Sequence, residues 1–262
     1  MDYVQPDEAK DMRGMRLALT MGVPGPWSES AKNILQIKGI EFTPVAQIGG
    51  FPNEELQAWT GHRNAPVAVY DDEPPRAGWA EILVQAERLA PEPALLPAEP
   101  AGRAEVLGVS FEICGEGGFG WTRRLMLIDG IKGRAEQVEQ VEQVERDVGQ
   151  VLSQRYGYTE DAAEPAPARV ASIMRWLASR LHQQADKGSK YLVGDALTAA
   201  DVYWACFAAI VRPLPNDLCP MPDMVRGWYD KPHPVVDDAC DPILFEHRDF
   251  IYENHLTLPL DF

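Results

Sequence analysis

The side chains best able to bind a metal ion or to carry redox chemistry are four cysteines and five histidines. The cysteines are scattered without a CxxC pair, at Cys114, Cys206, Cys219 and Cys240. The histidines, which also lack metal-ligand spacing, are His62, His182, His233, His247 and His255. Zinc sites and disulfide oxidoreductases need closely spaced ligands or thiols. We therefore expect reduced thiols, mostly buried as small apolar side chains, and no metal site.

Hydroxyl groups stand on both sides of a Gly-Pro loop, MGVPGPW at residues 21–27, which precedes a predicted helix. Thr20 comes before the loop, and Ser28 and Ser30 come after it. Serine is well suited to cap a helix, because its side-chain oxygen accepts a bond from a free backbone N–H group in the first turn. Capping is the structural interpretation of Ser28.

The chain is acidic, with 40 Asp and Glu against 24 Lys and Arg and a formal net charge of -16 over 262 residues. Such a surface repels phosphate backbones and anionic lipids, so we expect neither nucleic acid nor a membrane surface as partner. The first residues lack the basic and apolar regions of a secretory signal. No apolar run approaches the ~20 residues of a spanning helix. These features favour a cytoplasmic protein.

The elements that must position these groups form two units. After a polar leader at residues 1–14, expected to be poorly ordered, residues 15–90 alternate strands and helices, which predicts a small mixed α/β domain. Pro44 suggests that its strand lies at an edge, and Asn53 can cap the helix that follows it. We expect strands at residues 15–20, 41–46 and 67–70, and helices at 28–38, 54–60 and 78–90.

Beyond a proline-rich linker at residues 91–100, the chain from 101 to 262 predicts an all-α domain. The expected helices are at about 102–129, 133–156, 166–187, 199–212, 222–230 and 236–255. A perfect repeat, EQVEQVEQVE, covers residues 136–145. Valines three residues apart drift by about 60° per step around a helix, so the repeat favours a solvated charged helix over a coiled coil.

The clearest local pattern is YLVGDALTAAD at residues 191–201. Thr198 and Asp201 have the spacing of a capping box, and Leu197 and Val202 that of a hydrophobic staple. On physical grounds alone the pattern marks the start of a helix.

The same string resembles the G-D-x-L-T-x-A-D motif of the glutathione S-transferase superfamily. Three further segments resemble family motifs in the required order: IKGI at residues 37–40, APV at 65–67 and the linker-like PEPALLP at 91–97. The resemblance covers residues 15–255 and identifies a glutathione S-transferase-like protein of unassigned class. It implies a thioredoxin-like domain with a cis bond before Pro66, a helical-bundle domain and a homodimer.

Glutathione is the co-substrate that the resemblance implies, and a hydroxyl or thiol at the start of the first helix stabilises its thiolate. The family's Ser-Pro or Cys-Pro pair falls on Gly25-Pro26, and glycine has no group to donate. Ser28 is the nearest hydroxyl and the catalytic candidate, with the capping interpretation beside it. Trp27 flanks either the cofactor or the acceptor pocket, or it packs between the domains.

The family's Glu-Ser pair, which holds the γ-glutamyl group, also has no match, because the region reads GWAE at residues 78–81. Free N–H groups at that helix start can bind the carboxylate. Glu81, or Asp71 or Asp72, can pair with the ammonium group, and Arg76 with the carboxylate. The positions assigned to glutathione are Trp27, Pro66, Val67, Trp79, Ala80 and Glu81.

The acceptor pocket of the family lies between the domains, and the candidates here are Phe111, Cys114, Phe119, Trp121 and Leu125. Gly115–Trp121 breaks a helix and turns aromatic groups toward that cleft, whereas Tyr203, Trp204 and Phe207 are expected in the core. The resemblance implies conjugation, isomerisation or cleavage of a small hydrophobic electrophile. The alternative is a non-catalytic module of the same fold that binds a ligand or a protein.

Overall fold

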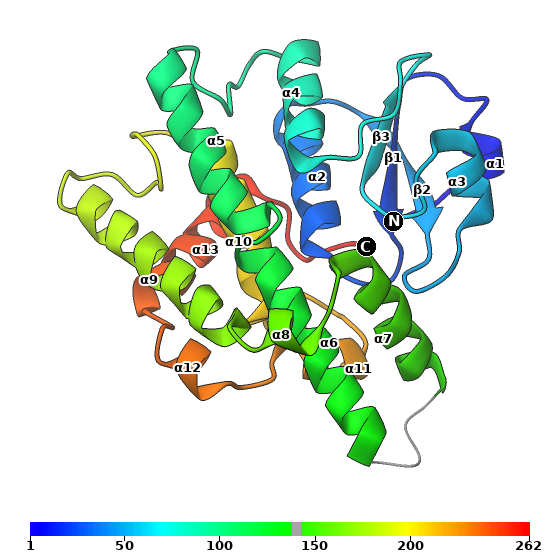
Figure 1. The fold of residues 1–262 in the computed structure, drawn as a ribbon. Coiled ribbons are helices and arrows are strands. Elements are labelled where there is room, and N and C mark those ends of the chain that lie inside the picture. The colour runs from blue at the N-terminus through cyan, green and yellow to red at the C-terminus, as the bar shows by residue number, and fades with distance from the viewer. Residues whose placement is uncertain (138–142) are drawn as a thin grey trace.

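The computed structural model describes the backbone of residues 1–137 and 143–262, and side chains outside 134–145. Its first part contains a three-stranded sheet between two layers of helices (Figure 1). One face carries α2 and α4, and the other carries α1 and α3. The strands are β1 (Met15–Thr20), β2 (Phe42–Gln47) and β3 (Val67–Tyr70), and the helices are α1 (Pro6–Ala9), α2 (Pro26–Ile37), α3 (Glu54–Thr60) and α4 (Trp79–Leu89).

The sheet has the order β2-β1-β3, which places Pro44 on an edge strand as expected. β2 runs parallel to β1, and β3 runs antiparallel to it, with Ala18 paired to both Val45 and Val67. The C-terminal ends of β1 and β2 and the N-terminal end of β3 therefore lie together. They form the edge of the sheet that crosses the strand ends, as distinct from the side edge along β2. A bridge between Ala68 and Arg76 adds one more antiparallel segment beside β3.

The leader is ordered, and the expectation that it would not be is wrong. Val4 pairs with Val45 alongside β2, donating its N–H to the Pro44 carbonyl at 3.0 Å and accepting from Ala46 at 2.9 Å. The side chain of Ala9 in α1 is fully buried. Val4 thus covers the edge of β2 that Pro44 leaves poor in donors.

Two helix caps differ from the prediction. α2 begins at Pro26 and is capped by Gly25, so Ser28 lies inside the first turn and does not cap the helix. Proline at the first helical position has the right φ and lacks an N–H group that would have no partner there. Asn53 precedes α3 but makes no capping bond, because its side chain hydrogen-bonds the backbone of Ile48 and Phe51.

Residues from 100 onward contain no strand in the described part of the chain. The predicted helix over 102–129 is two helices separated at Gly115–Gly118, and the one over 236–255 is split before Pro242. The centre of the EQV repeat, residues 138–142, lies outside the described residues. The helices are α5 (Pro100–Cys114), α6 (Phe119–Gln137), α7 (Gln143–Tyr156), α8 (Glu160–Ala163), α9 (Ala166–Ala185), α10 (Ala199–Phe207), α11 (Asp223–Tyr229), α12 (Pro234–Asp237) and α13 (Pro242–His255), with the short 3-10 turn η1 (Ala208–Ile210) after α10.

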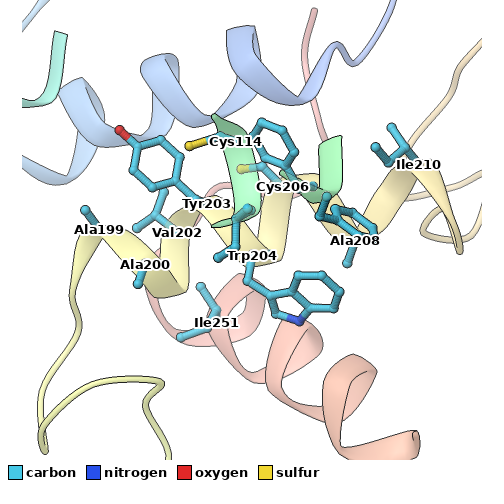
Figure 2. Close-up of a cluster of buried hydrophobic side chains, with 14 of the residues drawn as sticks. Cys114, Ala199, Ala200, Val202, Tyr203, Trp204, Cys206, Ala208, Ile210 and Ile251 are labelled. Atoms are coloured by element: carbon cyan, nitrogen blue, oxygen red, sulfur yellow. The ribbon is translucent and has the colours of Figure 1, made fainter. Parts of the chain in front are cut away.

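α10 is the central helix of the molecule and lies between α2 and α13 (Figure 2). The capping box prediction is confirmed at its start, where the Thr198 N–H donates to Asp201 Oδ2 at 2.8 Å. Tyr203, Trp204 and Phe207 are fully buried, as expected. The molecule is therefore a thioredoxin-like α/β domain followed by an all-helical domain, joined through α10.

The four cysteines are free thiols, and three of them are buried. Among the described residues, no group of histidine, cysteine and acidic side chains could hold a metal ion. None of the helices in the part of the chain that the structure describes is long and apolar enough to span a membrane.

Candidate functional site

The start of α2 lies at the edge of the sheet where β1 ends. The first backbone bond of the helix runs from the Glu29 N–H to the Gly25 carbonyl. The N–H groups of Trp27 and Ser28 have no acceptor among the described residues, and Pro26 has none to offer. Two free amides and the positive end of a 12-residue helix therefore create an anion-binding position.

Two hydroxyls face this position, and only one has a proton to give. Thr20 Oγ1 donates to Gln47 Oε1 at 2.9 Å, so its proton is engaged. Ser28 Oγ accepts the Thr20 N–H at 3.3 Å, and its own proton has no acceptor within the described chain. Ser28 is 3% exposed, so its hydroxyl lies buried beside the end of β1.

The space above these hydroxyls is open at Gly25. A Cβ atom built on Gly25 would lie 3.9 Å from both Ser28 Oγ and Thr20 Oγ1, which is ordinary van der Waals contact. The φ of Gly25 is -64°, which any residue can adopt. The position therefore has room for the Cβ atom of a side chain that this sequence does not supply.

Pro66 and Val67 border the same edge, at the beginning of β3. The Ala65–Pro66 bond is cis, as expected. Ala68 and Arg76 exchange two backbone bonds of 2.8 Å. In an antiparallel pair this register places Gly78 across from Pro66, so α4 begins beside the proline.

The start of α4 offers a second group of free amides. The N–H groups of Trp79, Ala80 and Glu81 have no acceptor among the described residues. Glu81 is exposed, and its Oε2 accepts the Gly78 N–H at 3.0 Å. Arg76 and Glu81 line a neighbouring cavity of about 190 Å³. An amino acid head group would thus meet amides for its carboxylate and Glu81 for its ammonium.

Asp71 and Asp72, the other acidic candidates, lie at the opposite edge of the sheet. β3 runs away from the site toward them, and they pair with the segment before β1. Asp71 Oδ1 accepts the Gly14 N–H at 2.9 Å, and Asp72 forms an ion pair with Arg13. The interpretation of either residue as an ammonium partner is wrong.

No protein-family model and no curated protein matches this sequence. Solved structures do match it. A glutathione S-transferase of Methylobacterium radiotolerans, in complex with glutathione sulfonate, has a TM-score of 0.61 at 16% identity over 92% of this chain and 91% of that one. A glutathione transferase family member from Pseudomonas fluorescens, with two glutathione bound, has a TM-score of 0.63 at 14% identity over 94% of both chains. A glutathione S-transferase domain-containing protein of Marinobacter aquaeolei scores 0.62 at 17% identity, covering 92% and 100%.

The chain has the glutathione S-transferase fold. The two helix starts and the cis-proline of this transferase fold come from separate segments, and the sheet brings them to one edge. The sequence predicted those three segments together through the resemblance.

Trp27 turns from the start of α2 into the helical domain of this transferase fold. Its Nε1 donates to the Cys114 carbonyl at 3.0 Å. Its ring packs edge-on against Phe207 at 4.8 Å and lies 6.1 Å from Tyr156. A Cβ on Gly120 would come within 3.2 Å of the Trp27 ring. Trp27 therefore packs between the domains.

The predicted acceptor residues occupy different environments. Phe119 is fully buried edge-on to Trp204 at 5.2 Å. Cys114 is buried with its Sγ donating to the Ser110 carbonyl, and burial raises the pKa of its thiol. Trp121 is half-buried against Tyr156, at 4.7 Å between ring centroids. Phe111 is 50% exposed on α5, and Leu125 is buried.

Sequence reasoning missed two residues of this region, Tyr156 and Gln47. Tyr156, at the end of α7, joins the rings of Trp27 and Trp121. Gln47 holds Thr20 and donates to the Ile48 carbonyl at 3.0 Å. A polar residue ending a strand was a detectable signal for Gln47, whereas nothing local marks Tyr156.

Proposed function

We propose that this protein binds glutathione at the edge formed by the starts of α2 and α4 and the cis-proline. The thiolate of the bound glutathione then attacks a small hydrophobic electrophile, with conjugation, isomerisation or cleavage as the outcome. Trp79, Ala80 and Glu81 hold the γ-glutamyl group, and the backbone at Pro66–Val67 orients the peptide. The Ser28 hydroxyl and the free amides of α2 stabilise the thiolate.

The single observation that supports this proposal best is the convergence of two groups of unpaired backbone N–H groups beside Pro66. Glutathione carries carboxylates and, when reactive, a thiolate, and helix N-termini favour each of these anions. Relatives of the same fold contain bound glutathione. Because the chain carries a net charge of -16, such local groups must offset a repulsive field.

The acceptor side of the proposed site is apolar. Trp121 presents a half-buried ring beside Tyr156, whereas Cys114 and Phe119 are buried in the core. Phe111 adds an exposed ring on α5. We further propose a cytoplasmic homodimer, on the resemblance alone.

A specific observation favours the second candidate, a non-catalytic ligand-binding module. Gly25 places no hydroxyl or thiol where the family carries one, and the Ser28 oxygen already accepts a backbone bond. Such a module would bind a ligand, glutathione among the candidates, or a partner protein without activating a thiol.

Calorimetry with reduced glutathione tests binding, and turnover of a chloronitrobenzene acceptor tests catalysis. We expect binding at millimolar glutathione, with measurable turnover that Ser28→Ala reduces by about tenfold, the effect of losing one charge-assisted hydrogen bond. Thr20→Val is the matched control, because its proton is already given to Gln47, and it should retain most of the activity.

Gly25→Ser separates the two candidates further. The Cβ of the new side chain would make only ordinary van der Waals contacts with Ser28 and Thr20, and serine is a good helix cap. A rise in turnover at unchanged glutathione affinity supports the assigned position of the thiolate. If glutathione does not bind, both candidates are refuted as glutathione-binding proteins. If it binds but neither the wild type nor Gly25→Ser turns over the acceptor, the non-catalytic module is supported.

A further inference from the structure

A cavity of about 120 Å³ lies far along the chain from the proposed site, between α6 and the segment before α12. Basic side chains dominate its polar lining: Arg123 from α6, with Lys231 and His233 from that segment. One acidic residue, the exposed Asp129, also lines the cavity, and its Oδ1 accepts the Tyr158 hydroxyl at 2.8 Å. Arg123 and Lys231 thus place two positive charges at one cavity of a chain with a net charge of -16.

Arg123 is a buried cation with no carboxylate partner among the described residues. It is 5% exposed, and its Nη2 reaches only the carbonyls of Tyr229 and Lys231, at 3.3 and 3.5 Å. No acidic side chain pairs with it in the described chain, and its Nε has no acceptor there. Burying a guanidinium in this way is costly unless an anion or water satisfies it.

The electrostatics of Arg123 agree with this description. Burial lowers its pKa to about 10, and the neighbouring positive charge of Arg124 acts in the same direction. Asp237 and Tyr229 oppose the shift without reversing it. The guanidinium remains charged at neutral pH and lacks sufficient local compensation.

Two more polar side chains line the same cavity. His233 Nδ1 is buried without a partner among the described residues. The Lys231 ammonium lies over Gly130, since a Cβ there would be 2.9 Å from its Nζ. No ion pair to Lys231 occurs in the described part of the chain. A void that holds one water needs only roughly 10–15 Å³, so this cavity has room for a polyatomic ion.

We propose that this cavity binds a small oxyanion, between the Arg123 guanidinium, the Lys231 ammonium and the His233 imidazole. The planar guanidinium supplies donors in a geometry suited to paired oxygens, and the ammonium supplies a mobile point charge. The assignment is independent of the proposed transferase function, because none of these side chains contributes to the sheet edge.

Titration calorimetry with inorganic phosphate at constant ionic strength, on the full chain, tests the assignment. We expect saturable binding with one site, and a dissociation constant about tenfold higher in Lys231→Ala, as expected for losing one charge-assisted contact. The matched control is Lys187→Ala, which removes an exposed lysine elsewhere and should leave the constant unchanged. Equal weakening in both variants indicates only a general charge effect and overturns the assignment.

Gly130→Ala tests the same site without a change of charge. The new methyl group would displace the Lys231 ammonium, while alanine favours the helix, so binding should weaken several-fold with thermal stability retained. Saturating reduced glutathione should not compete with phosphate. Competition, or the absence of phosphate binding in the wild-type protein, overturns the proposal.

Discussion

Asp201→Ala should be among the most destabilising single substitutions in this chain. Asp201 is fully buried, and its Oδ2 accepts the Thr198 N–H and hydroxyl, both at 2.8 Å. Its Oδ1 accepts the Leu192 N–H at 2.7 Å and lies 3.0 Å from His247 Nε2. Alanine leaves two backbone N–H groups buried without partners, because these groups cannot turn elsewhere.

Each buried donor left unpaired costs about 1–3 kcal/mol, and hydrogen bonds to a charged group are at the upper end. Counting only the two backbone groups, we expect a loss of about 4 kcal/mol in the free energy of unfolding. Urea unfolding followed by tryptophan fluorescence measures it. Thr198→Ala, which removes one hydroxyl contact, should cost about 1 kcal/mol, and the exposed Asp195→Ala should be close to neutral.

The result that refutes this reasoning is a cost for Asp201→Ala no larger than that of Thr198→Ala. It would mean that the backbone amides find water or other acceptors when the carboxylate is removed. The helix start would then depend on propensity and packing instead of this carboxylate.

Three further outcomes follow from buried groups. Burial raises the pKa of Glu29 above its usual 4.5, with Lys32 opposing the shift. The carboxyl therefore contributes stability at low pH, and this contribution is lost as pH rises through the raised pKa. The melting temperature of Glu29→Gln relative to that of the wild type should rise between acidic and neutral pH, and a difference in melting temperature that does not change with pH contradicts this. Gly120→Ala brings a Cβ within 2.3 Å of a ring on α10 and should lower stability by about 2 kcal/mol, whereas Gly108→Ala, with open space on α5, should raise it by about 1 kcal/mol. Burial raises the pKa of every thiol, and half-buried Cys240 should be alkylated first, with mass spectrometry of the native protein as the check.

The strands were predictable because each is a short apolar run bounded by glycine, proline or acidic turns. β1 matches its predicted range, and β3 follows directly after Pro66. Local patterns also predicted the start of α10, where Thr198 and Asp201 form the expected capping box. These features depend on residues within a few positions of one another, so the sequence displays them directly.

The features that were missed depend on contacts distant in sequence. Val4 looked like part of a polar leader, yet it pairs with Val45 at the free edge of β2. Ser28 has the preferred type for a cap, but Gly25-Pro26 starts the helix two residues earlier. Tyr156 reaches Trp27 only because α7 packs against the sheet domain. Periodicity and turn chemistry carry no record of such pairings.

α10 connects the two halves of the proposed site. The Tyr203 hydroxyl donates to the Trp79 carbonyl at 3.1 Å, at the start of α4. Four residues later, on the same face of the helix, Phe207 packs against Trp27 at the start of α2. On the other side, Trp204 Nε1 donates to the Leu244 carbonyl at 2.9 Å. One helix face therefore sets the distance between the two groups of free amides.

Tyr203→Phe tests this positioning role. The ring contact with Trp79, at 5.5 Å and edge-on, remains, while the hydrogen bond to the α4 start is lost. We expect a stability cost of about 1 kcal/mol and a weaker glutathione affinity, although Tyr203 is buried in the core. Trp204→Phe is the control, since its lost bond faces α13: it should destabilise the protein without changing glutathione affinity. Equal effects of both variants on affinity would mean that general loosening, and not the α10 contact to Trp79, controls the site.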